Sequence, residues 1–178
     1  MKFLWGLTGS VATTLVDKIR VEVTKIVGSE LRFIATESAI KIDKRVGTKY
    51  RMETAIDEDE WTRYNYEKSV LHIDLAKEYD VFIIAPCSAN TLGKIANGLC
   101  DNLLTCCLRA WPLDKPVIIA PSMNSVMYSH PITQEHIIKL KSWGHNIIDP
   151  IEKKLFCGDY GVGAMANIDD IISYIEFK

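Results

Sequence analysis

The amino-acid sequence predicts an α/β fold in which a parallel β-sheet is covered by helices on both faces. Short apolar runs recur along the chain, and segments with apolar residues at helical spacing separate them. The runs do not alternate apolar with polar residues, which is typical of strands buried on both faces. Most of them end in turns rich in glycine, proline and hydroxyl residues. Together these observations predict repeated strand–turn–helix units in a single domain over residues 1–178.

The first unit begins with residues 3–12, which predict a strand followed by a glycine and serine turn. Apolar residues at helical spacing then continue until Gly28. At the turn, Gly9 allows a ligand to approach the backbone closely, and Ser10 offers a hydroxyl group. The turn lacks the complete glycine fingerprint of dinucleotide sites, so it does not identify a ligand by itself.

The second unit has a strand at residues 30–35 and then two hydroxyl residues, Thr36 and Ser38, where the next helix should begin. They are a second candidate contact for a phosphate group. Residues 41–66 have poor periodicity and dense charge, which favours a short strand and exposed loops. Within them, residues 57–60 are four consecutive acids, which we interpret as solvated charge rather than a metal site.

A helix is expected next, with Ser69 as its N-cap and His72 in its first turn. The positive end of the helix dipole disfavours an imidazolium, so His72 is a candidate for a neutral catalytic base. A histidine among apolar residues is also often a packed structural residue, and the sequence leaves both interpretations open.

The central unit is a buried strand at residues 81–84, a turn that contains Pro86 and Ser88, and a helix through Ala96. Such a corner presents free backbone N–H groups, hydroxyl groups and the Asn90 amide at the positive end of a helix dipole. It suits an anion or the polar edge of a cofactor. An ordinary capped turn has the same local pattern.

Two further strands are expected at residues 115–120 and 144–148, and a closing helix at residues 168–175. Residues 121–127 form the turn after the first of these strands, and Pro131 suits the first turn of the next helix. In such sheets ligands bind beyond the carboxyl ends of the strands. The turns that should therefore share one edge are those at Gly9, Thr36, Ser88 and Ser122.

Residues 153–166 contain three glycines within six positions. This composition favours a mobile flap over a site rather than part of the core. Cys157 lies in this segment. The other four cysteines form no CxxC pair and have no histidine at metal-ligand spacing, so we expect them to be buried structural residues.

The composition narrows the class of protein. A chain of 178 residues with 48% hydrophobic and 25% charged residues is an ordinary globular domain. A formal net charge of −2 gives no basic footprint for nucleic acid. No apolar run approaches the roughly 18 residues that cross a membrane, and residues 3–5 are too short for a signal-peptide core. We therefore expect a cytoplasmic protein with neither nucleic acid nor a membrane as a partner.

Six segments, taken in order, resemble the homo-oligomeric flavin-containing cysteine decarboxylases, and among them the enzymes that act on phosphopantothenoylcysteine. Each segment alone is a weak signal, but the series runs from the first strand to the final helix. The segments are residues 9–11, 70–75, 88–94, 101–105, 121–124, and 154–159 together with Gly161, Gly163, Ala164 and Met165.

The resemblance implies a flavodoxin-like, Rossmann-like three-layer sandwich that binds FMN and no metal, with active sites where the subunits of a homotrimer meet. It implies that His72 is the catalytic base and Cys157 the proton donor. Asn124, Met127 and Lys77 would contact a small-molecule substrate. The residues that would contact FMN are Gly9, Ser10, Val11, Thr36, Ser38, Ser88, Ala89, Asn90, Thr91 and Ser122.

The implied reaction is decarboxylation of 4′-phospho-N-pantothenoylcysteine to 4′-phosphopantetheine in coenzyme A biosynthesis, which makes the chain a carboxy-lyase. Direct loss of CO₂ would leave a carbanion without an electron sink. Oxidation of the Cβ–S unit to a thioaldehyde creates one, and decarboxylation then gives an enethiolate. Reduced FMN and a proton from Cys157 complete the thiol product, so no outside electron donor is consumed.

Two positions depart from the family's pattern. Members often have a pair of arginines after the histidine segment, where this chain has Ala76 and Lys77, and a lysine lacks the bidentate geometry of arginine. Ser122 replaces the usual small residue before Met123 and Asn124, which adds a hydroxyl group near the flavin.

Three alternatives remain for a chain of this pattern. A peptidyl-cysteine decarboxylase of lantibiotic maturation takes the C-terminal cysteine of a peptide, and it does not need the acid that Cys157 provides. A non-catalytic subunit that regulates a phosphatase can lack the acid–base set or carry long acidic tails. A flavin prenyltransferase would leave the Cys157 flap without a role.

Overall fold

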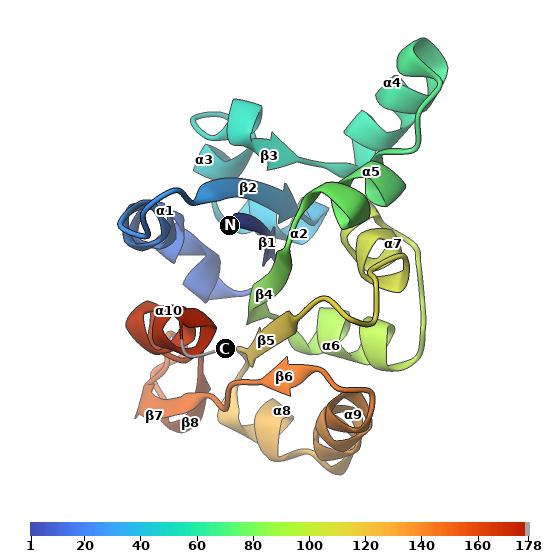
Figure 1. The fold of residues 1–178 in the computed structure, drawn as a ribbon. Helices are drawn as coiled ribbons and strands as arrows, with labels where there is room; N and C mark the ends of the chain where they lie inside the picture. Colours follow the sequence, from blue (N-terminus) through green and yellow to red (C-terminus); the bar gives the residue numbers. More distant parts are fainter. Residues whose placement is uncertain (177–178) are drawn as a thin grey trace.

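Six strands form a parallel sheet in the computed structural model, which describes residues 1–176 (Figure 1). Their bounds are β1 (Lys2–Leu7), β2 (Glu30–Ala35), β3 (Thr54–Ala55), β4 (Val81–Cys87), β5 (Val117–Pro121) and β6 (Asn146–Ile147). The strand order is β3-β2-β1-β4-β5-β6. This is the Rossmann order, and without the two-residue edge strand β3 it matches the flavodoxin order. The order reverses between β1 and β4, where such sheets bind their ligands.

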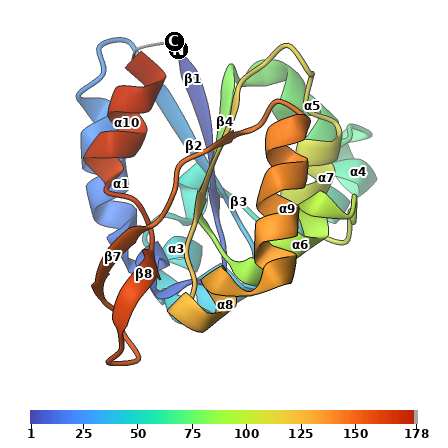
Figure 2. The same cartoon turned by 90° about the horizontal axis from the view of Figure 1, so that it is seen from below.

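Helices cover both faces of the sheet, as expected (Figure 2). Helices α1 (Val16–Thr24) and α10 (Ile168–Glu176) lie on one side. The other side carries α5 (Leu71–Glu78), α6 (Ala89–Ala96), α7 (Leu103–Arg109) and α9 (Pro131–Ser142). The remaining helices are α2 (Glu37–Ile42), α3 (Lys44–Gly47), α4 (Asp57–Glu67), α8 (Ser125–Ser129) and the 3₁₀ helices η1 (Val11–Leu15) and η2 (Arg51–Glu53).

The side chains of β1 explain why its sequence is apolar throughout. Phe3, Trp5 and Leu7 belong to the buried cluster on one face of the sheet. Leu4 belongs to the cluster on the opposite face. Both faces are therefore core, and the predicted three-layer α/β sandwich is confirmed.

For residues 41–66 the predicted short strand is confirmed as β3, but the prediction of exposed loops around it is wrong. Helices α3 and α4 form there, and the acidic run 57–60 is the first turn of α4. Its carboxylates suit the positive end of the helix, and Asp59 accepts hydrogen bonds from the Ile56 N–H and from Arg51. Asp57 and Glu60 accept hydrogen bonds as well, so three of the four acids make specific contacts. Helix α4 extends away from the body of the molecule (Figure 1).

The N-cap expected at Ser69 is also wrong. Helix α5 begins at Leu71, its N-cap is Val70 without a side-chain hydrogen bond, and the buried Ser69 hydroxyl has no partner among the described residues. The backbone N–H of His72 receives its partner from another helix instead, as described below. The boundary shift still leaves His72 in the first turn of α5.

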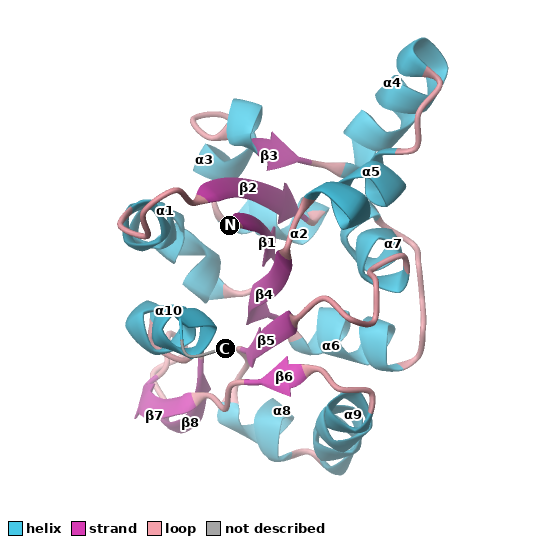
Figure 3. Cartoon of the chain, in the orientation of Figure 1, coloured by secondary structure: helices cyan, strands magenta, loops and turns pink. Residues whose placement is uncertain are grey.

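The segment expected as a flap forms an antiparallel hairpin of β7 (Ile151–Lys154) and β8 (Tyr160–Ala164), separate from the main sheet (Figure 3). The tip is exposed, but Met165 and Ala166, which lie within residues 153–166, are buried in the core, so that end of the expected flap is wrong. At Gly163 a Cβ atom would lie 2.3 Å from the Met123 carbonyl oxygen, so only glycine allows β8 to pass this turn. The Met123 N–H donates to the Gly163 carbonyl at 2.9 Å, which anchors the base of the hairpin.

Within residues 1–176, no helix combines the length and the apolar character needed to cross a membrane.

Candidate active site

A cavity of about 1000 Å³ opens at the carboxyl ends of β1, β2, β4 and β5. The turns at Gly9, Thr36, Ser88 and Ser122 all line it, as expected for one edge of a parallel sheet. Gly9 is needed for close packing, because a Cβ atom there would lie 2.8 Å from the Ser38 Cβ. The hairpin covers one side of the cavity through residues 153–157.

Most of the site residues named from the sequence share this cavity. Asn124, Met127 and Cys157 line it. So do Gly9, Ser10, Val11, Thr36, Ser38, Ser88, Ala89, Asn90, Thr91 and Ser122. His72 and Lys77 do not line it; both lie on α5.

Helix N-termini surround the cavity. Thr36 caps α2, Ser88 caps α6 and Asn124 caps α8, each through a side-chain oxygen that accepts a backbone N–H of the first turn. The remaining N–H groups of these first turns have no partner within their helices. Since helix N-termini carry partial positive charge, this rim suits a phosphate or another polar anion.

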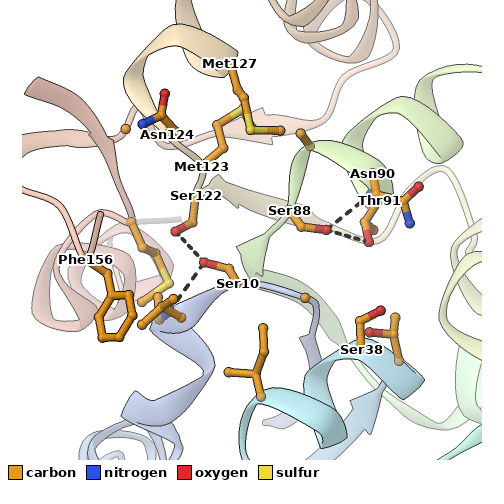
Figure 4. A pocket seen from close by; sticks show the side chains of 18 of the residues that line it. Ser10, Ser38, Ser88, Asn90, Thr91, Ser122, Met123, Asn124, Met127 and Phe156 are labelled. Atoms are coloured by element: carbon orange, nitrogen blue, oxygen red, sulfur yellow. Dashed lines mark hydrogen bonds between the residues drawn. The ribbon is translucent and has the colours of Figure 1, made fainter. Parts of the chain in front are cut away.

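Hydroxyl groups join the strand ends beneath the cavity (Figure 4). The Ser10 and Ser122 Oγ atoms lie 2.8 Å apart and link the turns after β1 and β5. The fully buried Thr8 donates to the Pro86 carbonyl at 2.7 Å and accepts from the Ser88 N–H at 2.8 Å. Thr8 therefore fixes the spacing of β1 and β4, a role that the sequence analysis did not predict.

A second group of polar side chains lies where the hairpin tip meets α8. The Asn124 amide nitrogen donates to the Cys157 Sγ and to Asp159 Oδ2, both at 3.3 Å. The Cys157 thiol donates to the same Asp159 oxygen at 3.3 Å. The Cys157 thiol is thus held at the cavity by an amide and a carboxylate. Asp159 belongs to the quoted motif, but its sequence position alone assigned it no role.

His72 is held by a residue that was not predicted from the sequence. Glu60 of α4 accepts the His72 backbone N–H through Oε2 at 3.0 Å, and its Oε1 lies 2.9 Å from the His72 Nδ1. The His72 carbonyl accepts the Cys107 thiol at 3.3 Å. The sequence predicts Glu60 only as a solvated acid, because no local pattern shows that the first turn of α4 contacts the first turn of α5.

Buried titratable groups near the site have shifted pKa values. Burial raises the pKa of the Asp57 carboxyl, which lines the cavity, although the Leu103 N–H that it accepts at 2.7 Å acts in the opposite direction. Burial also raises the pKa of the Cys87 and Cys107 thiols, so both stay protonated and inert.

The prediction of buried cysteines is confirmed for Cys87 and Cys107. It is wrong for Cys100, which is exposed, and for Cys106, which is only partly buried. Within residues 1–176, no group of three histidine, cysteine, aspartate or glutamate side chains is placed to hold a metal ion.

Comparison with known proteins gives a consistent result. The flavoprotein family model matches residues 1–178. A putative phosphopantothenoylcysteine decarboxylase of Dictyostelium discoideum is 47% identical over 176 residues, which cover 95% of this chain and 88% of that protein. The phosphopantothenoylcysteine decarboxylase of Mus musculus is 39% identical over 176 residues, which cover 98% and 85%.

Solved structures match over nearly the whole chain. A mutant of PPC decarboxylase with cysteine replaced by serine, complexed with pantothenoylaminoethenethiol, has a TM-score of 0.91 at 43% identity and covers 99% of this chain and 96% of that chain. The FMN-binding protein AtHal3 has a TM-score of 0.86 at 43% identity, with 99% and 95% covered. The peptidyl-cysteine decarboxylase EpiD is more distant, with a TM-score of 0.77 at 27% identity and 98% of both chains covered.

Proposed function

Because this chain belongs to the flavoprotein family, and within it to the phosphopantothenoylcysteine decarboxylases, we propose that it binds FMN and decarboxylates 4′-phospho-N-pantothenoylcysteine to 4′-phosphopantetheine. The observation that carries the proposal is one cavity lined both by the strand-end turns and by the Cys157 thiol. The step belongs to coenzyme A biosynthesis, and we place the enzyme in the cytoplasm.

The donors around the cavity fit FMN, which presents a phosphate, several hydroxyl groups and a flat ring with a polar edge. Helix N-termini and hydroxyl groups match the first two. Apolar side chains of Val11, Met123 and Met127 line the same space and suit the ring. The residues that would hold FMN are Gly9, Ser10, Val11, Thr36, Ser38, Ser88, Ala89, Asn90, Thr91 and Ser122.

When bound, FMN supplies reversible hydride transfer with the Cβ–S unit of the substrate, which provides the electron sink for loss of CO₂. Asn124 would hold the substrate carboxylate through the amide that now donates to Cys157 and Asp159. Met127, half exposed at the rim, would contact the substrate from α8. Cys157 would donate the proton that converts the enethiolate into the product, because its S–H already lies at the cavity.

We expect His72 to act at the cavity of a neighbouring subunit, where it would take the proton of the substrate thiol. Cys157 and Asn124 of the same chain line the cavity, but His72 of that chain does not. Helix α4, next to His72, exposes large apolar side chains: Trp61 is 67% exposed and Tyr66 is 85% exposed. Such a surface favours burial against a second copy. Lys77 lies on the same helix as His72 and would enter the shared site with it, binding the phosphate of the substrate.

The proposed assembly is a homotrimer, so the particle mass should be about 60 kDa, three times the 20.1 kDa chain. Analytical ultracentrifugation of the FMN-loaded protein measures this mass directly. A purely monomeric particle that retains full turnover would contradict the shared site.

The reaction itself is tested by incubating the purified yellow protein with phosphopantothenoylcysteine and measuring CO₂ and the product mass. We expect one CO₂ and one 4′-phosphopantetheine for each substrate consumed, without an added reductant. The proposal would be contradicted if the purified protein bound no flavin or released no CO₂.

The closest alternative in chemistry is a peptidyl-cysteine decarboxylase. Its representative EpiD is 27% identical to this chain, whereas the PPC decarboxylase mutant is 43% identical. The Cys157 thiol at the cavity also provides the acid that a final reduction needs. A peptide with a C-terminal cysteine is therefore expected to react far more slowly than phosphopantothenoylcysteine in the same assay, and faster turnover of the peptide would favour the alternative.

A further inference from the structure

Glu60 binds His72 through both of its carboxylate oxygens. Oε2 accepts the His72 backbone N–H at 3.0 Å, and Oε1 lies 2.9 Å from the ring nitrogen Nδ1. The two contacts join the first turn of α4 to the first turn of α5, across twelve residues of chain. This geometry fixes both the position of the helix start and the plane of the imidazole ring.

The contact is partly shielded from water and is not shared with a cation. The side chains of His72 and Glu60 are 26% and 16% exposed. Among the described residues, His72 is the one basic side chain within ion-pair distance of Glu60, whereas Glu67 on the same helix pairs with Arg63 at 2.7 Å. Glu60 is therefore free to act on the imidazole alone.

An ionised carboxylate only accepts hydrogen bonds, so the His72 Nδ1 must carry the proton in this contact. In the neutral ring, the lone pair then lies on Nε2, the nitrogen that faces away from Glu60. We propose that Glu60 is a positioning residue for His72: it selects the tautomer in which Nε2 is the base, and it stabilises the imidazolium formed when Nε2 takes a proton.

The inference rests on the proposed function and adds a residue to its acid–base machinery. In the oxidative step, Nε2 would take the proton of the substrate thiol, while Nδ1 keeps its proton and continues to donate it to Glu60. FMN, when bound, would supply the acceptor for the Cβ hydride. Cys157 supplies one proton to the enethiolate, and with the returned hydride this gives the product thiolate. The proton held on Nε2 then returns to that sulfur, and Cys157 regains its own proton from solvent.

Glu60→Gln tests the tautomer sharply. The His72 backbone N–H always donates, so the oxygen of a glutamine must face it, and the amide NH₂ must face Nδ1. Nδ1 then has to accept, which moves the ring proton to Nε2 and removes the base. Glu67→Gln is the matched control, because it makes the same chemical change on the same helix at an exposed ion pair.

Two measurements report the result. In ¹⁵N-histidine spectra of the FMN-loaded protein, the wild type and Glu67→Gln should show His72 protonated at Nδ1, whereas Glu60→Gln should show it protonated at Nε2. In anaerobic stopped-flow mixing with phosphopantothenoylcysteine, Glu60→Gln should reduce bound FMN about 100-fold more slowly, with FMN affinity and particle mass unchanged.

A wild-type protein with the proton on Nε2 would overturn the inference, and that measurement needs no variant. Unchanged FMN reduction in a folded Glu60→Gln protein would overturn it as well. Failure of the proposed function looks different: the wild-type FMN would not be reduced by phosphopantothenoylcysteine at all, while the ¹⁵N spectrum would still report which nitrogen of His72 carries the proton.

Discussion

Replacing His72 with asparagine is expected to lower CO₂ release by about 1000-fold while the protein stays yellow. General base catalysis is typically worth 10²–10⁴ in rate. No residue that lines the cavity of the same chain is an imidazole that could replace His72. The side-chain amide of asparagine can still donate a hydrogen bond to Glu60, so the first turn of α5 should keep its structure. The measurements are CO₂ release under saturating substrate and the visible spectrum of the purified variant.

His136→Asn is the control for this change. His136 lies on α9, does not line the cavity and contacts the Asn97 side chain at 3.3 Å, so its loss should leave turnover unchanged. A colourless or monomeric His72→Asn protein would assign His72 a structural role. Normal turnover in the yellow trimer would remove His72 from the mechanism.

Replacing Cys157 with serine is expected to uncouple the two halves of the reaction. CO₂ release should continue, because the carboxylate-binding Asn124 and the flavin cradle are intact. The finished thiol should fall by about 100-fold or more, because a serine hydroxyl is a far weaker proton donor than a thiol. The product that accumulates should be an enethiol, two hydrogens lighter than 4′-phosphopantetheine, which mass spectrometry of the reaction mixture detects.

The relative solved with its cysteine replaced by serine is complexed with an ethenethiol, which is the class of product expected here. Cys100→Ser is the matched control, because Cys100 is also an exposed free thiol but does not line the cavity. Full formation of 4′-phosphopantetheine by Cys157→Ser would show that the proton comes from another group.

The variants His72→Asn and Cys157→Ser together test whether the active site is shared between subunits. If His72 and Cys157 of one site come from different chains, dissociating and remixing the variants should place a wild-type pair in about a quarter of the sites. Those sites alone would make the thiol product. If both residues act within one chain, the mixture would make no more thiol than the separate variants do.

Part of the site could be read from local pattern alone. Residues 30–35 are β2 to the residue, and Thr36 and Ser88 cap the helices that follow their strands. Such features depend on neighbours within a few positions, and the direction of parallel strands then brings the turns to one edge. The prediction of solvated charge at the acidic start of α4 is wrong, because these carboxylates cap the helix and contact Arg51, His72 and Leu103. None of these contacts is visible as a periodic pattern in the sequence.

Short-range periodicity and turn chemistry are enough to predict the α/β class, the edge of the sheet that holds the cavity, and the residue types available there. Three features could be seen only in the folded chain: the Glu60 carboxylate binds His72, Asp159 and Asn124 hold the Cys157 thiol, and His72 lies outside the cavity of its own chain. The reason is physical: these contacts join separate helices and a hairpin whose relative placement is set by the packing of the whole core.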